Sequence, residues 1–239
     1  MRRRSPPEPG TRAASEMMPQ VLETNEQPFG AVLTEGHMLA VARQAILLHS
    51  CCGPCSTAVV ERLAARFDIT LFFYNPNITD RDEYERRLEA QRRFVDRYNM
   101  SPDTDRKLTL VIGAYEPGEF FARVRGLEAE PEGGARCALC FEMRLQRAAE
   151  YAALHAFERF TTTLSVSPHK NHALIRDIGT RLAMKFGLTF HPEDFKKNDG
   201  ARRSAELARA YGLYRQNYCG CDFSRRAEGT GEVRGMGGR

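Results

Sequence analysis

Seven cysteines of the 239-residue chain fall into three short clusters. These clusters are Cys51-Cys52-Gly-Pro-Cys55, Cys137-Ala-Leu-Cys140 and Cys219-Gly-Cys221, and no cysteine lies between them. Thiolates are soft ligands, and zinc or iron–sulfur centres gather them from distant parts of a chain. The clusters therefore predict one folded site that binds a metal or carries out redox chemistry.

Each cluster is open to more than one chemistry. After Cys51 and Cys52, Gly53 permits a turn and Pro54 suits the start of a helix, whose dipole stabilises thiolates. The C-x-x-C pair is used by zinc sites, iron–sulfur clusters and dithiol oxidoreductases alike. The C-x-C pair can supply metal ligands or close a small, strained disulfide of the kind that tends to be catalytic. Because one zinc ion takes four ligands, seven cysteines favour a cluster together with a second redox or metal function.

The composition argues against a secreted disulfide framework. The cysteine count is odd, and residues 1–7 lead from arginines into Ser-Pro-Pro instead of an apolar signal segment. No apolar run approaches the length that spans a bilayer. We therefore expect a protein of the reducing cytoplasm with no membrane partner. The net charge of +4 does not by itself indicate nucleic acid, so an RNA-binding surface would depend on how the charges are arranged.

Composition also divides the chain into three parts. Residues 1–38 are rich in Pro, Glu, Arg and Thr, and residues 225–239 are mostly Gly, Arg and Glu, so we expect both to be disordered. Residues 39–224 are expected to form a single catalytic α/β domain.

Short apolar runs alternate with helix-period segments within residues 39–224. Strands are expected at 45–48, 69–74, 108–112, 160–164 and 188–190, and helices at 57–67, 119–124, 137–157, 173–186 and 201–211, with a further charged helix carrying Tyr84, Leu88, Val95 and Tyr98 on one face. This alternation predicts a Rossmann-like parallel sheet flanked by helices on both faces. Ligands of such sheets bind beyond the C-terminal ends of the strands, and the first cysteine cluster directly follows a strand. We expect the metal site there.

Polar and aromatic side chains of the predicted loops would open onto the same crevice. Lysine and arginine would bind phosphates and tyrosine would stack on a base, so a nucleotide or RNA substrate fits this set. The candidates for substrate binding are Tyr74, Asn75, Asn77, His169, Lys170, Asn171, Lys196, Lys197, Arg215 and Tyr218. The plainer interpretation of any one of them is a residue that caps a helix or solvates a loop.

Together, the motifs resemble the QueH family of epoxyqueuosine reductases. They are LLHSCCGPCS at 47–56, FYNPNI at 73–78, RCALCF at 136–141, TTL at 162–164 with SPHKN at 167–171, and YRQNYCGC at 214–221. The resemblance covers about residues 45–224 in the family's order. It implies the last step of queuosine biosynthesis, in which the epoxide of epoxyqueuosine at the wobble position of tRNA is reduced to the cyclopentene of queuosine.

The resemblance also implies cofactors and roles for the cysteines. It implies a [4Fe-4S] cluster bound by Cys51, Cys52, Cys137 and Cys140, and a redox-active pair formed by Cys219 and Cys221. The partners would be tRNA carrying epoxyqueuosine and an electron donor that the sequence does not identify. A second iron ion beside the cluster would act as a Lewis acid on the epoxide oxygen. Because adjacent side chains of an extended segment point to opposite sides, Cys51 and Cys52 would diverge. One of them would then bind the cluster, and the other would bind the second metal together with Cys55 and a sulfur of the Cys219–Cys221 motif.

Two alternatives remain open at this point. A tRNA sulfur-transfer enzyme would need a glycine-rich phosphate loop after the first strand. Residues 51–55 offer one glycine and a proline without an N–H, which disfavours phosphate binding. A zinc-stabilised RNA-binding module without catalysis is the other alternative, and the colour and iron content of anaerobically purified protein would distinguish it.

Overall fold

The structure is a computed structural model that describes residues 43–225. Its elements are β1 Gln44–Ser50, α1 Gly53–Leu63, β2 Phe67–Phe73, α2 Arg81–Met100, β3 Thr109–Ile112, α3 Pro117–Arg123, α4 Ala135–Leu154, β4 Arg159–Thr162, α5 His172–Phe186, β5 Thr189–Phe190 and α6 Gly200–Ala210, with short 3₁₀ turns at Thr163–Val166 and Asp222–Ser224. Residues 1–38, expected to be disordered, and the start of the expected domain at residue 39 lie outside the described residues. Of the expected disordered tail 225–239, only Arg225 is described, and it forms an ion pair with Asp80.

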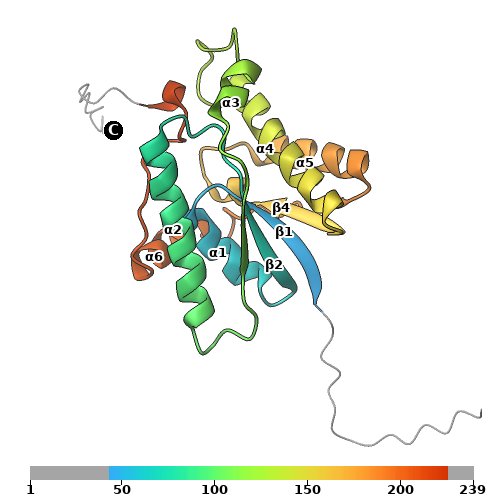
Figure 1. The fold of residues 1–239 in the computed structure, drawn as a ribbon, viewed down its shortest axis with the longest axis vertical. Helices are drawn as coiled ribbons and strands as arrows, with labels where there is room; N and C mark the ends of the chain where they lie inside the picture. The colour runs from blue at the N-terminus through green and yellow to red at the C-terminus, as the bar shows by residue number, and fades with distance from the viewer. Residues whose placement is uncertain (1–42, 226–239) are drawn as a thin grey trace, which may run out of the picture. The chain divides into compact units, whose positions relative to one another are not determined.

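The five strands form one parallel sheet in the order β3-β2-β1-β4-β5 (Figure 1). Within the described residues, the first strand is the central strand β1, the next two build outward to β3, and the chain then crosses back to place β4 on the other side of β1. This arrangement confirms the predicted Rossmann-like α/β class. The reversal of strand order at β1 creates a crevice at the C-terminal ends of β1 and β4, where ligands of such sheets bind.

Both faces of the sheet are buried by helices (Figure 1). Along β1, Ile46 and Leu48 pack into the core shared with α1, α2 and α6, whereas Leu47 packs into the core shared with α4 and α5. Successive strand side chains point to opposite faces, so a strand covered on both sides needs a continuous apolar run. The sequence Ala-Ile-Leu-Leu meets that requirement, which explains why the run predicts a strand of a parallel sheet.

Some boundaries differ from those expected from the sequence. Helix α1 begins at Gly53 instead of Thr57 because Cys52 serves as its N-cap, its Sγ accepting from the Cys55 N–H. Phe67, expected to end that helix, instead begins β2, where it pairs with Gln44 and packs into the core. Strand β4 ends at Thr162, whose hydroxyl oxygen accepts from the Leu164 N–H and starts a 3₁₀ turn.

None of the helices within residues 43–225 combines the length and apolar character required to cross a membrane.

Candidate metal and substrate site

The thiols of Cys51, Cys52 and Cys55 lie together directly after β1. Their Sγ atoms are all within 4.8 Å of one another, with 3.8 Å between Cys51 and Cys52 and 2.8 Å between Cys52 and Cys55. The expectation that the first two sulfurs diverge is wrong, because β1 ends at Ser50 and Cys51 lies in a bend instead of an extended segment. Three convergent thiols offer three ligands to one metal centre.

Neighbouring groups donate hydrogen bonds to these sulfurs. Thr163 Oγ1 donates to Cys51 Sγ at 3.2 Å, and Gln216 Nε2 donates to Cys52 Sγ at 3.0 Å. Hydrogen bonds from the thiols of Cys52 and Cys55 lower the pKa of Cys51 well below its ordinary value, and the positive charges of Lys170 and Arg144 act in the same direction. The site therefore favours a thiolate at Cys51, which is the form that binds metals.

Close packing against α2 fixes the start of α1 beneath the three thiols. A Cβ on Gly53 would lie 2.5 Å from the carbonyl oxygen of Ala90, so only glycine allows this approach of the two helices. The turn that carries Cys52 and Cys55 is thereby held against the body of the domain.

The remaining cysteines come from α4 and from the C-terminal part of the described chain. Cys137 and Cys140 lie in the first turns of α4, as predicted, and Cys140 packs with Cys221, Phe120 and Val124. Burial raises the pKa of Cys140 to about 12. A metal ion would offset this penalty, because metal binding displaces the thiol proton.

Arg144 is a buried cation close to sulfurs of all three cysteine clusters. Its side chain is 2% exposed, and its Nη2 donates to Asn75 Oδ1 at 2.5 Å. No carboxylate among residues 43–225 pairs with it, and its Nε has no hydrogen-bond partner there. Burial lowers the pKa of Arg144, but the nearby sulfurs of Cys140, Cys51 and Cys219 raise it by more. Since an unpaired buried charge is costly, thiolates or an anionic cluster are the counter-charge that this arginine needs.

A cavity of about 360 Å³ opens beside these groups at the C-terminal ends of the strands. The bend after β1 contributes Cys51 to its lining, the first turn of α1 contributes Cys55, and the loop after β2 contributes Asn75 and Asn77. The loop after β4 contributes residues 166–170, and residues 215–219 form a further part of the wall. The topology therefore places a hollow where the strand order reverses, as the fold class predicts.

Comparison with known proteins matches the model of the family described as "Epoxyqueuosine reductase QueH" to residues 46–227. The chain belongs to the QueH family. It is 43% identical over 187 residues to the epoxyqueuosine reductase QueH of Streptococcus pyogenes serotype M1, covering 78% of this chain and 72% of that one. It is 42% identical to the Staphylococcus epidermidis protein of the same name, covering 78% and 79%, and 34% identical to that of Thermotoga maritima, covering 75% and 89%.

Several of the polar residues predicted for substrate binding line the cavity of this QueH-family chain. They are Asn75, Asn77, His169, Lys170, Arg215 and Tyr218. Asn77 is almost fully buried, and its Oδ1 has no hydrogen-bond partner among the described residues. Burial lowers the pKa of Lys170, but the sulfurs of Cys219, Cys51 and Cys55 raise it by more, so its ammonium stays charged at neutral pH. The cavity thus combines a hydrogen-bond acceptor without a partner, Asn77 Oδ1, with the Lys170 ammonium beside the sulfurs.

The other predicted residues lie outside this cavity. Tyr74 Oη donates to Glu119 Oε2 at 3.1 Å in a separate hollow between α3 and α4. Asn171 is the N-cap of α5, its Oδ1 accepting from the Leu174 N–H. Lys196 Nζ donates to the Lys170 carbonyl oxygen at 3.4 Å, and neither Lys196 nor the exposed Lys197 lines the cavity.

Two arginines of the site were not predicted from the sequence. Arg144 follows Cys140 by one helical turn, and this spacing places both on one face of α4. Arg87 lies on α2, where it contacts the backbone of residues 218 and 219. Charged residues on helices are usually solvated, so neither arginine stood out in the sequence. The i to i+4 spacing from Cys140 was the one feature that could have indicated that Arg144 belongs to the site.

His49, within the LLHSCC motif, is a structural residue. Its Nε2–H donates to the Tyr74 carbonyl oxygen at 3.1 Å, so its Nδ1 accepts from the Thr162 hydroxyl at 2.8 Å. Burial lowers its pKa to about 3. The neutral imidazole links β1 to both neighbouring strands beneath the cysteines.

Proposed function

We propose that this chain reduces epoxyqueuosine to queuosine at the wobble position of tRNA, the last step of queuosine biosynthesis. The observation that carries the proposal is the meeting of the family's motifs around one cavity, with sulfurs of all three cysteine clusters close to Arg144. The relatives that match most of the chain bear the name of this activity.

The reaction is a two-electron reduction in which both epoxide carbon–oxygen bonds break and a carbon–carbon double bond forms. Two electrons and two protons enter, and the oxygen leaves as water. Oxidation of the Cys219 and Cys221 thiols to a disulfide would release the same two electrons and two protons. An electron donor would then reduce the disulfide and restore the thiols.

Cys51, Cys52, Cys137 and Cys140 would hold a [4Fe-4S] cluster, and Cys55 would bind a second iron. The donor set supports this assignment, because the thiols are soft ligands and Arg144 balances their charge. When bound, the cluster would carry single electrons and the second iron would supply a Lewis acid.

The polar residues of the cavity would position the substrate. The Lys170 ammonium is a proton donor to the leaving oxygen, since it is charged and close to the sulfurs. Asn77 Oδ1 would accept from a hydroxyl or amine of the nucleoside. Arg215 lines the cavity and forms no ion pair within residues 43–225, so it is free to contact an RNA phosphate.

The deciding experiment is anaerobic incubation of iron-loaded protein with tRNA that contains epoxyqueuosine and a strong reductant, followed by mass analysis of the nucleosides. We expect queuosine to replace epoxyqueuosine. A matched reaction with Cys219→Ser should leave the epoxide unchanged. Absence of queuosine with fully loaded wild-type protein would overturn the proposed function.

A further inference from the structure

A wall of the cavity consists of chain with no helix or strand. Residues 215–219, which end at Cys219, are consecutive and all line the cavity. We name residues 214–219 the wall segment. Since no regular backbone pairing fixes the wall segment, side chains from elsewhere must determine where it lies.

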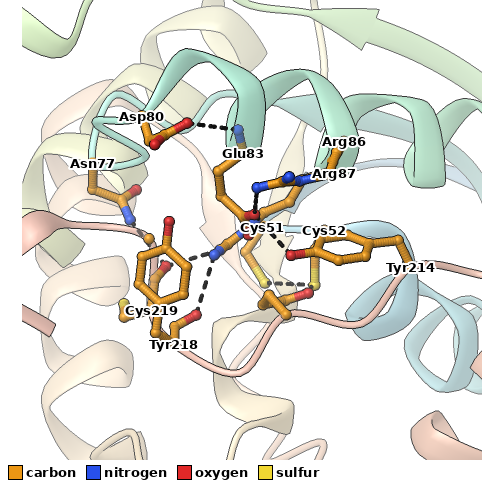
Figure 2. Close-up of polar contacts among 12 residues, drawn as sticks. Cys51, Cys52, Asn77, Asp80, Glu83, Arg86, Arg87, Tyr214, Tyr218 and Cys219 are labelled. Atoms are coloured by element: carbon orange, nitrogen blue, oxygen red, sulfur yellow. Dashed lines mark hydrogen bonds and ion pairs between the residues drawn. The ribbon is translucent and has the colours of Figure 1, made fainter. Parts of the chain in front are cut away.

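Helix α2 supplies those side chains through a buried ion pair. Arg87 Nε lies 2.6 Å from Glu83 Oε1, and the two side chains are only 3% and 1% exposed. As Figure 2 shows, the pair faces the wall segment. Arg87 Nη1 donates to the Cys219 carbonyl oxygen at 2.9 Å, and Arg87 Nη2 donates to the Tyr218 carbonyl oxygen at 3.2 Å.

The same pair also reaches the opposite end of the wall segment. Tyr214 Oη donates to Glu83 Oε2 at 2.7 Å, and the guanidinium of Arg87 lies 5.1 Å from the ring centroid of Tyr218 (Figure 2). Two residues one helical turn apart therefore contact the wall segment at both of its ends. Arginine suits this task because its planar fork donates in several fixed directions at once.

We propose that Glu83 and Arg87 are positioning residues that fix the wall segment and thereby set the place of Cys219 in the cavity. A buried ion pair contributes little net stability, because desolvation offsets the attraction of the charges. Here the guanidinium instead satisfies two consecutive backbone carbonyls, those of Tyr218 and Cys219, at the start of the Cys219–Cys221 motif. Any effect on turnover rests on the proposed reductase function, whereas the placement of Cys219 can be measured without it.

The test compares Arg87→Met, which keeps most of the side-chain length, with Arg81→Met on the same helix. Arg81 pairs with Glu85 at 2.9 Å in an exposed i,i+4 pair and is not among the residues that line the cavity. The anaerobic holoprotein is treated with iodoacetamide, and mass spectrometry gives the alkylation rates of Cys219 and of Cys221, which is not assigned to a metal and packs with Phe120 and Val124. We expect Arg87→Met to raise the rate ratio of Cys219 to Cys221 by about tenfold, and Arg81→Met to leave it within twofold.

A general loss of stability would raise the alkylation rates of both cysteines together, so the ratio isolates the position of Cys219. If Arg87→Met does not fold, Tyr214→Phe removes a single hydrogen bond to the wall segment and should raise the ratio to a smaller extent. Arg87→Lys should restore part of the wild-type ratio, because lysine keeps the ion pair but cannot bridge both carbonyls. A wild-type ratio in the folded Arg87→Met variant would overturn the proposal, even if the protein reduces epoxyqueuosine.

Discussion

Gln216 Nε2 donates a hydrogen bond to Cys52 Sγ at 3.0 Å, although 164 positions separate the two residues. Cys52 is fully buried, and the Cys55 N–H also donates to its sulfur, at 3.4 Å. Hydrogen bonds to cluster sulfurs raise the reduction potential, because they stabilise the more negative reduced state. The wall segment therefore contributes to the electronic environment of the first cysteine motif as well as to the shape of the cavity.

If the proposed iron–sulfur cluster binds at these cysteines, replacing Gln216 with leucine should lower its reduction potential. A net hydrogen-bond contribution of about 1 kcal/mol corresponds to about 40 mV for a one-electron couple. Redox titration followed by electron paramagnetic resonance measures the shift. Asn217→Leu is the control, since Asn217 lines the same cavity but makes no hydrogen bond to Cys52. An unchanged potential in Gln216→Leu would place the Cys52 sulfur away from the redox centre.

Substitution of the cysteines should separate ligands from the redox pair. Cys51→Ala and Cys140→Ala should lose the brown absorbance of an iron–sulfur cluster together with reductase activity. Cys219→Ser should keep most of the iron, because Cys219 is assigned to the redox pair. Iron analysis of each purified variant shows which cysteines are metal ligands. Wild-type iron in Cys140→Ala would remove that residue from the ligands, and substantial iron loss in Cys219→Ser would add Cys219 to them.

Loss of the Arg144 charge should lower the reduction potential of the proposed cluster further than loss of the Gln216 hydrogen bond. Arg144→Met removes a full buried charge beside the sulfurs, so the reduced state loses more electrostatic stabilisation. The same redox titration measures this effect. Arg147→Met is a suitable control, because Arg147 lies on the same helix but pairs with Glu119 and Glu150 near the surface. Equal reduction potentials for Arg144→Met and Arg147→Met would contradict the role assigned to Arg144.

Gly220 should be intolerant of a side chain. Its φ of 117° is a conformation that other residues rarely adopt, and a Cβ there would lie 3.0 Å from Ile78 Cγ1 and 3.1 Å from Arg87 Nη1. Gly220→Ala should cost about 1–3 kcal/mol of stability. Gly118→Ala has open space around its added Cβ and should be neutral or stabilising. Urea unfolding followed by circular dichroism compares the two, and equal stabilities would show that the turn at Gly220 can relax.

The stability contributed by Glu83 should depend on pH. Burial raises its pKa, but the hydrogen bonds from Tyr214 and Arg87 and the charge of Arg87 outweigh burial, so the pKa is lowered from 4.5. A carboxyl whose pKa is lower in the folded state stabilises the fold above its unfolded pKa and loses that contribution as pH falls through the folded value. The stability advantage of wild type over Glu83→Gln should therefore persist above pH 4.5 and shrink below it. Urea titrations from pH 7 to pH 3.5 measure the difference, and a constant difference over this range would contradict the assignment.

The fold class could be predicted from the sequence because it depends on the order of apolar runs and not on their limits. The continuous apolar residues at 45–48 identify a doubly covered strand whether it ends at Leu48 or at Ser50. The start of α1 could not be predicted in the same way. Cysteine is not among the residues that usually cap helices, so the capping role of Cys52 leaves no pattern to recognise.

The site could be predicted only where chemistry is local to a motif. The cysteine clusters and the loop residues after strands identified the cavity. Asn171 is a polar loop residue like those that line the cavity, but it caps a helix instead. The burial of Arg87 depends on a segment more than 120 positions further along the chain. One feature of the sequence does indicate a buried polar contact on this helix, because Gln91 interrupts its apolar face. Glu83, Arg87 and Gln91 form a buried polar stripe at four-residue spacing.

The wall segment lies close to the C-terminal end of the described residues, and this has a consequence for biosynthesis. The ribosome releases Cys51, Cys52 and Cys55 well before Cys219 and Cys221, so the cavity of a nascent chain is unfinished until residues 215–219 emerge. Chains cut short before Tyr214 would expose the first three thiols without Gln216 or the wall. Every incomplete copy would then present thiols that can be oxidised or can bind metal ions, and cellular quality control would have to remove such copies.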